Sequence, residues 1–135
     1  MGLAERRSAE RFKNEDYPGW KTQIDAAAGS EVTVEVAWDE LAVADYADSY
    51  AEFFPQVYFE PLVQALGAVG VDEMGRSALR DGLSKIVIRN TDQFYSRSGF
   101  SFTDGVLTID HKPYTNIGDG EERAKAIQHI LEAGL

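Results

Sequence analysis

The residues best suited to chemistry lie close together near the end of the chain. Asp110 and His111 end a predicted strand, and the loop after them holds Tyr114 and Asn116. A histidine titrates near neutral pH and a carboxylate can orient it, so this set suits a small acid/base or metal site. Adjacent residues on a strand point to opposite faces, which opposes cooperation between Asp110 and His111. Because the residue types suit such chemistry even so, a small enzyme with its site at these four residues is one alternative function.

Other patterns of catalytic or metal-binding residues do not occur in the sequence. The chain has no Cys and two His, and it contains neither a His-Glu-x-x-His motif nor a calcium-loop motif. A cysteine nucleophile, a thiolate zinc site and a disulfide framework are therefore excluded. We assign no catalytic residue and predict neither a metal nor a cofactor.

A glycine-rich segment has the spacing of a phosphate-binding loop. It runs from Gly70 to Ser77, with Arg76 where that motif has Lys. Asp72 and Glu73 would place two negative charges where backbone amides should cradle a phosphate, and the preceding segment is predicted to be a helix rather than a strand. We therefore interpret the segment as a turn between two helices, with Asp72 as an N-cap.

Acidic residues gather in one block of the sequence. The chain carries 23 Asp plus Glu against 13 Lys plus Arg, a formal net charge of -10. Residues 22–75 contain eleven of the acids and no Lys or Arg, so this block holds the whole excess of negative charge. An electrostatic field of one sign attracts an oppositely charged partner, and a negative field opposes the binding of nucleic acid. The same pattern also suits a solvated acidic face, against which the basic segments fold back.

The acidic side chains of this block are predicted to share a helix. Asp39 is a suitable N-cap for a helix over 39–54, which Pro55 would end. Tyr50 and Phe54 fall on its apolar side, whereas Leu41 falls on the acidic side. The predicted contact surface for a basic protein consists of Asp39, Glu40, Asp45, Asp48 and Glu52.

Four strands are predicted from period-two alternation and turn residues. They cover residues 31–37, 85–90, 99–103 and 106–110. The pair Asp104-Gly105 predicts a type I′ hairpin between the last two strands. Glu31 and Glu35 face out from the first strand, and Lys85 and Arg89 from the second. Because opposite charges attract across neighbouring strands, we expect these two strands to be adjacent.

Helices fill most of the remaining sequence. They are predicted over residues 3–14, 20–28, 39–54, 61–69, 72–81 and 120–133, and Pro18-Gly19 is expected to break the first from the second. The resulting fold class is α+β, a small and mainly antiparallel sheet of about four strands packed with helices. Residues 1–135 form a single predicted domain, with residues 1–18 as an arm that could be mobile.

Length and composition narrow the class of protein. The 135 residues are 44% hydrophobic, which excludes a disordered chain. No secretory signal and no membrane span are expected, and we predict a cytoplasmic protein. The favoured function is a small acidic binding module, an inhibitor, immunity-type or adaptor protein, that contacts a basic protein through residues 39–52. We predict that it binds neither nucleic acid nor membrane. A self-associating structural protein is a further alternative, and a homo-oligomer is compatible with each of these functions.

Overall fold

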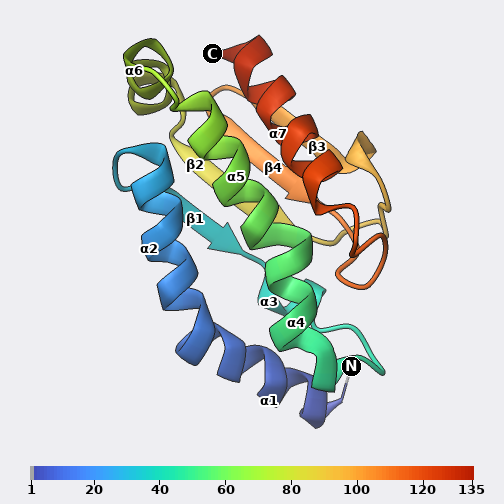
Figure 1. Ribbon diagram of the computed structural model, residues 1–135. Helices are drawn as coiled ribbons and strands as arrows, with labels where there is room; N and C mark the ends of the chain where they lie inside the picture. Colours follow the sequence, from blue (N-terminus) through green and yellow to red (C-terminus); the bar gives the residue numbers. More distant parts are fainter. Residues whose placement is uncertain (1) are drawn as a thin grey trace.

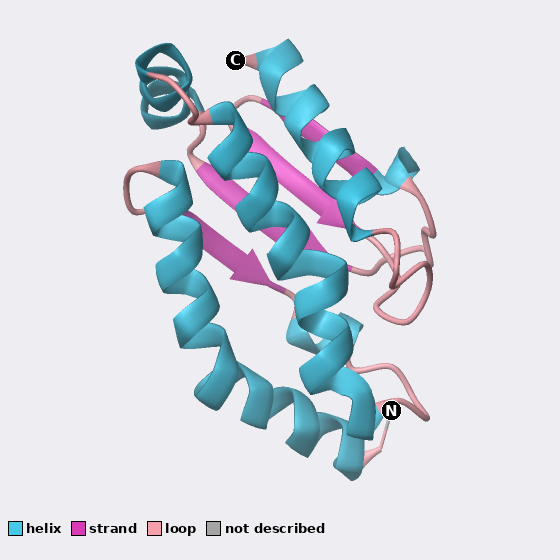
Figure 2. Ribbon diagram, in the orientation of Figure 1, coloured by secondary structure: helices cyan, strands magenta, loops and turns pink. Residues whose placement is uncertain are grey.

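The computed structural model describes residues 2–135 and has an α+β fold with a four-stranded sheet (Figure 2). The strands are β1 (Thr33–Val36), β2 (Lys85–Arg89), β3 (Phe100–Thr103) and β4 (Val106–Asp110). Their order in the sheet is β1-β2-β4-β3. All four lie within the predicted strands.

The sheet is mixed, so the prediction of a mainly antiparallel sheet was wrong on strand direction. β1 and β2 are parallel, β2 and β4 are parallel, and only β3 and β4 are antiparallel. A long helical connection over residues 37–84 carries the chain back before β2 begins, which permits a parallel pair. The hairpin signal specified the β3–β4 pair alone, and the direction of the other strands depends on how the helices pack.

The predicted hairpin is confirmed in its register and in its turn. Phe100 pairs with Ile109 and Thr103 pairs with Val106, across the two-residue turn. Asp104 has φ 54° and Gly105 has φ 79°, and positive values at both positions define the type I′ turn. The local sequence therefore determined this element.

The predicted adjacency of the first two strands is also confirmed. Lys85 Nζ on β2 lies 3.4 Å from a carboxylate oxygen of Glu35 on β1. The guanidinium of Arg89 pairs at 3.3 Å with Glu40, beyond the end of β1. Glu31 lies outside the strand and takes no part in these pairs.

Helices cover one face of the sheet. They are α1 (Leu3–Arg11), α2 (Tyr17–Ala28), α3 (Trp38–Leu41), α4 (Tyr50–Phe54), α5 (Glu60–Val69), α6 (Glu73–Gly82) and α7 (Gly120–Gly134). Figure 1 shows α2, α5 and α7 side by side over the sheet. The core lies between these layers, where Ile86, Ile88, Leu107 and Ile109 are fully buried.

The first helix continues through Pro18, so the predicted break at Pro18-Gly19 was wrong. A π-helical segment, η1 (Phe12–Asp16), joins α1 to α2. Pro18 is the second residue of α2, where an α-helix can spare the N–H group that proline lacks. Phe12 is buried and contacts the rings of Phe54 and Phe59, so core packing favours the continuous helix.

The predicted helix over 39–54 was also wrong. α3 ends at Leu41, Asp45 has φ 72°, and a 3₁₀ turn over Ala47–Ser49 precedes α4. Leu41 is fully buried, which a straight helix could not achieve while burying Tyr50 and Phe54 on its opposite side. The chain therefore turns between these residues.

Pro55 does not end the helix that follows. It begins a second π-helical segment, η3 (Pro55–Phe59), which joins α4 to α5 without a break in the helix. As at Pro18, the proline stands where one helical hydrogen-bonding pattern gives way to another. The aromatic rings that follow it, Tyr58 and Phe59, are fully buried.

Candidate functional site

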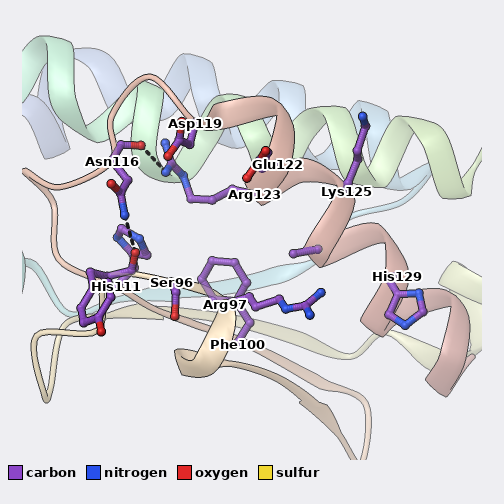
Figure 3. A pocket seen from close by; sticks show the side chains of 12 residues that line it. Ser96, Arg97, Phe100, His111, Asn116, Asp119, Glu122, Arg123, Lys125 and His129 are labelled. Atoms are coloured by element: carbon purple, nitrogen blue, oxygen red, sulfur yellow. Dashed lines mark hydrogen bonds between the residues drawn. The ribbon is translucent and has the colours of Figure 1, made fainter.

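A cavity of about 670 Å³ opens at the end of the sheet, between α7 and the segment before β3. Tyr95 and Arg97 come from that segment, Phe100 begins β3, His111 follows β4, and α7 supplies the opposite wall (Figure 3). The loops after β2 and β4 meet here because both parallel strands end at the same edge of the sheet. Residues far apart in the sequence thereby share one pocket.

His111 forms part of the inner wall of this cavity and is 1% exposed. Its Nδ1 lies 2.6 Å from the carbonyl oxygen of Lys112, so Nδ1 must carry a proton and donate. Burial lowers the pKa of His111 below its ordinary value of 6.5, opposed in part by the bond to Lys112. In the neutral ring Nε2 is an acceptor, and no group within residues 2–135 donates to it.

Arg123 of α7 lies beside His111 and is 5% exposed. Its Nε donates to the Val57 carbonyl at 3.1 Å, and Nη2 donates to the carbonyls of Gln56 at 3.2 Å and Ile117 at 3.1 Å. Nη1 donates to the Asn116 carbonyl. These bonds tie α7 to η3 and to the 116–117 loop. Among the described residues no carboxylate forms an ion pair with this guanidinium.

Of the four residues predicted as an alternative site, two line the cavity. Asn116 lies at its edge with His111, and its Nδ2 donates to the Tyr95 carbonyl at 2.6 Å. Asp110 points the other way and accepts a bond at 2.9 Å from the backbone N–H of Thr91. The opposite orientation of Asp110 and His111 follows from strand alternation.

Tyr114 lies apart from the cavity and makes a surface contact with another aromatic ring. It stacks on Tyr46 with ring centroids 4.5 Å apart, and Lys112 Nζ lies 5.6 Å from its centre. Such stacking and cation–π contacts account for its position. The structure thus separates Tyr114 and Asp110 from His111.

Acidification should destabilise the protein through His111. Below pH 6.5 the unfolded chain protonates this imidazole while the folded chain resists, so the free energy of unfolding falls as pH falls, by at most about 1.4 kcal/mol per pH unit for one proton. His111→Asn keeps a donor for the Lys112 carbonyl but cannot titrate, and should flatten this dependence. Urea unfolding between pH 7.5 and about 5 measures it.

His129→Asn is the matched control, because it removes the exposed histidine of α7. It should leave the pH dependence of stability as in the unmodified protein. Equal slopes for His111→Asn and His129→Asn would contradict the assignment of this dependence to His111.

The predicted acidic contact residues do not form one stripe. Asp39, Asp45, Asp48 and Glu52 are exposed, but they belong to α3, an irregular loop, a 3₁₀ turn and α4. Glu40 is engaged within the fold, because it accepts from Arg89 and, at 3.1 Å, from the backbone N–H of Asn90.

Two basic residues fold back toward this region. Arg7 and Arg11 of α1 line a shallow hollow together with Asp48. The negative charge of Asp48 is therefore partly offset by its surroundings.

A second hollow, the acidic groove, lies where the two π-helical segments face each other. Its volume is about 600 Å³, and its carboxylates come from Glu15, Asp16, Glu52 and Glu60. Its apolar part includes Phe12, Trp20, Ala51 and Pro55, and its lining contains no Lys or Arg. No ion pair within residues 2–135 involves any of the four carboxylates.

Sequence reasoning found one of these four carboxylates, Glu52, as a contact residue. Glu15 and Asp16 fell within the predicted arm, and they reach the groove only because the helix continues through Pro18. Glu60 belonged to the acidic block without being singled out. The lack of Lys and Arg in this block was the signal that could have led us to count Glu60 among the contact residues.

Within residues 2–135, no three His, Asp or Glu side chains converge in a way that could hold a metal ion. None of the described helices combines the length and the apolar character needed to cross a bilayer. Comparison with protein-family models, with curated proteins and with solved structures found no match to this chain.

Proposed function

We propose that this is a cytoplasmic binding protein that uses the acidic groove to hold a basic segment of a partner protein. The observation that carries the proposal is the groove itself, in which four exposed carboxylates surround an apolar floor and no cation lines the site. We retain the acidic contact surface predicted from the sequence, but we place it between two helices instead of on one face of a single helix.

Physical chemistry supports such a site. Carboxylates of one sign placed close together repel one another, and a partner bearing Lys or Arg relieves this repulsion. Trp20 and Pro55 are partly buried, so a partner's apolar side chains can cover them. π-Helical segments occur frequently at functional sites, and here two of them flank the groove. The expected partner element is an amphipathic segment that carries basic and apolar residues.

The exposed acids outside the groove have a weaker role. Asp39 and Asp45 add to the negative field that an approaching basic partner meets, which favours a faster association. Glu40 contributes less, because its carboxylate is paired with Arg89.

A synthetic amphipathic helical peptide of Lys and Leu provides a direct test. Its association rate should fall by about tenfold when salt is raised from about 0.05 M to 0.5 M, because the screening length shrinks from about 14 Å to about 4 Å. The triple variant Glu15→Gln, Glu52→Gln, Glu60→Gln should weaken binding by roughly tenfold at the lower salt. Surface plasmon resonance gives both rates.

The matched control is Asp81→Asn, Asp92→Asn, Glu132→Gln, which removes three exposed carboxylates outside the groove. It changes the net charge equally and should alter the peptide's Kd by less than about twofold. Equal losses in the two triple variants would show that net charge alone attracts the peptide. That result, or an absence of binding to the unmodified protein, would overturn the proposal.

A further inference from the structure

The cavity at His111 has a charge opposite to that of the protein as a whole. The chain carries a net charge of -10, yet Arg97, Arg123 and Lys125 line the cavity against Asp119 and Glu122. His111 and His129 add two ionisable rings. This local excess of one positive charge makes the cavity a place where a small anion is attracted.

Two ionisable groups, Arg123 and His111, lie on the inner wall of the cavity. Arg123 bonds only to carbonyl oxygens and forms no ion pair with another described residue, whereas the acceptor Nε2 of neutral His111 cannot bond to an anion, so the attraction comes from the arginine. Both side chains are more than nine-tenths buried. Burial disfavours the charged guanidinium, the charge of Asp119 offsets part of this cost, and an anion in the cavity would offset more of it.

The mouth of the cavity holds a free guanidinium. Arg97 is exposed, and its guanidinium forms no hydrogen bond or ion pair with another described residue. Figure 3 shows its side chain reaching across the cavity toward His129 on α7, with the ring of Phe100 to one side of it. An arginine fork binds a carboxylate through two hydrogen bonds, and an aromatic ring supplies an apolar surface.

We propose that this cavity binds a small organic carboxylate, with the carboxylate on Arg97 and its apolar body against Phe100. The volume, about 670 Å³, is within the range of roughly 300–1,000 Å³ found for small-molecule sites. A local excess of one positive charge suits a monoanion better than the dianion of a phosphate monoester. The site shares no lining residue with the acidic groove, so it goes beyond the function proposed above.

Benzoate is a suitable probe, because it combines one carboxylate with an apolar ring. In ¹H–¹⁵N correlation spectra of the full chain, benzoate should shift backbone amides around residues 95–100, 111 and 119–129 in a saturable way. The expected Kd is about 1 mM or tighter, as is reasonable for so small a ligand. Benzyl alcohol, which lacks the charge, and inorganic phosphate, which lacks the apolar body, should each bind at least about fivefold more weakly.

Arg97→Gln should weaken benzoate binding by roughly tenfold, and Arg7→Gln is the matched control. Both remove an exposed arginine and change the net charge equally, but Arg7 lies on α1 and does not line the cavity. Because Arg97 is exposed, its replacement should leave the fold intact, and the spectrum of the variant can verify this. The proposal would be overturned by an absence of saturable shifts, by equal binding of benzyl alcohol or phosphate, or by equal effects of the two variants.

Discussion

Replacing Arg123 by methionine should lower the free energy of unfolding by about 3–5 kcal/mol, among the largest effects expected of one side chain here. Methionine can fill much of the same space but has no hydrogen-bond donor. The carbonyls of Gln56, Val57, Asn116 and Ile117 would then lose the donors that Arg123 supplies. The bond to Val57 is buried and the other three are partly buried, so a buried carbonyl left without a partner costs roughly 1–3 kcal/mol and hydration reduces the loss at the others.

Chemical denaturation measures this loss, and Lys125→Met is the control. Lys125 lies two residues further along α7, is exposed, and forms no ion pair with another described residue. Its replacement should change the free energy of unfolding by no more than about 0.5 kcal/mol. If Arg123→Met were as stable as Lys125→Met, the carbonyl contacts of Arg123 would not hold α7 in place.

Two glycine-to-alanine substitutions should have opposite effects on stability. A Cβ at Gly75 of α6 would lie 1.7 Å from the carbonyl oxygen of Val69, a backbone atom that cannot move without shifting the end of α5. We expect Gly75→Ala to cost about 2–3 kcal/mol. At Gly67, inside α5, a Cβ would meet no atom within 4 Å, so Gly67→Ala should stabilise by about 0.5–1 kcal/mol.

Thermal or urea unfolding of the two variants distinguishes close packing from a general effect of helix propensity. Propensity alone would make both substitutions stabilising, since alanine is the better helix former. A stabilised Gly75→Ala variant would therefore show that α5 and α6 separate easily at this point.

The same region shows how a motif can have a purely structural origin. Gly70–Ser77 has the spacing of a phosphate-binding loop, but Gly75 is required by the close approach of α6 to Val69. Asp72 caps α6 by accepting from the Gly75 N–H at 2.8 Å, which confirms the predicted turn between two helices. The charges of Asp72 and Glu73 and the helix predicted before them were sufficient to identify this turn from the sequence.

Elements specified by neighbouring residues were predicted well from the sequence. The hairpin depends on alternation and on two turn residues that tolerate positive φ, so Asp104-Gly105 fixed its register. The pairing of Lys85 with Glu35 is not local, since the two residues are 50 positions apart, and it was predicted because opposite charges on two strands favour their adjacency. The opposite orientations of His111 and Asp110 followed from strand alternation, although both side chains are buried.

Both candidate sites depend on packing between distant segments. Proline lowers helix propensity locally, but Phe12 and Tyr58 are buried only if the helices continue past Pro18 and Pro55 through π-helical segments. That continuation brings Glu15 and Glu52 to one groove. The net charge could be counted from the sequence, and the residues able to take part in catalysis or binding could be named from it. Which charges face a common space was decided by the tertiary structure, because burial of the core outweighs the local preferences that a sequence pattern records.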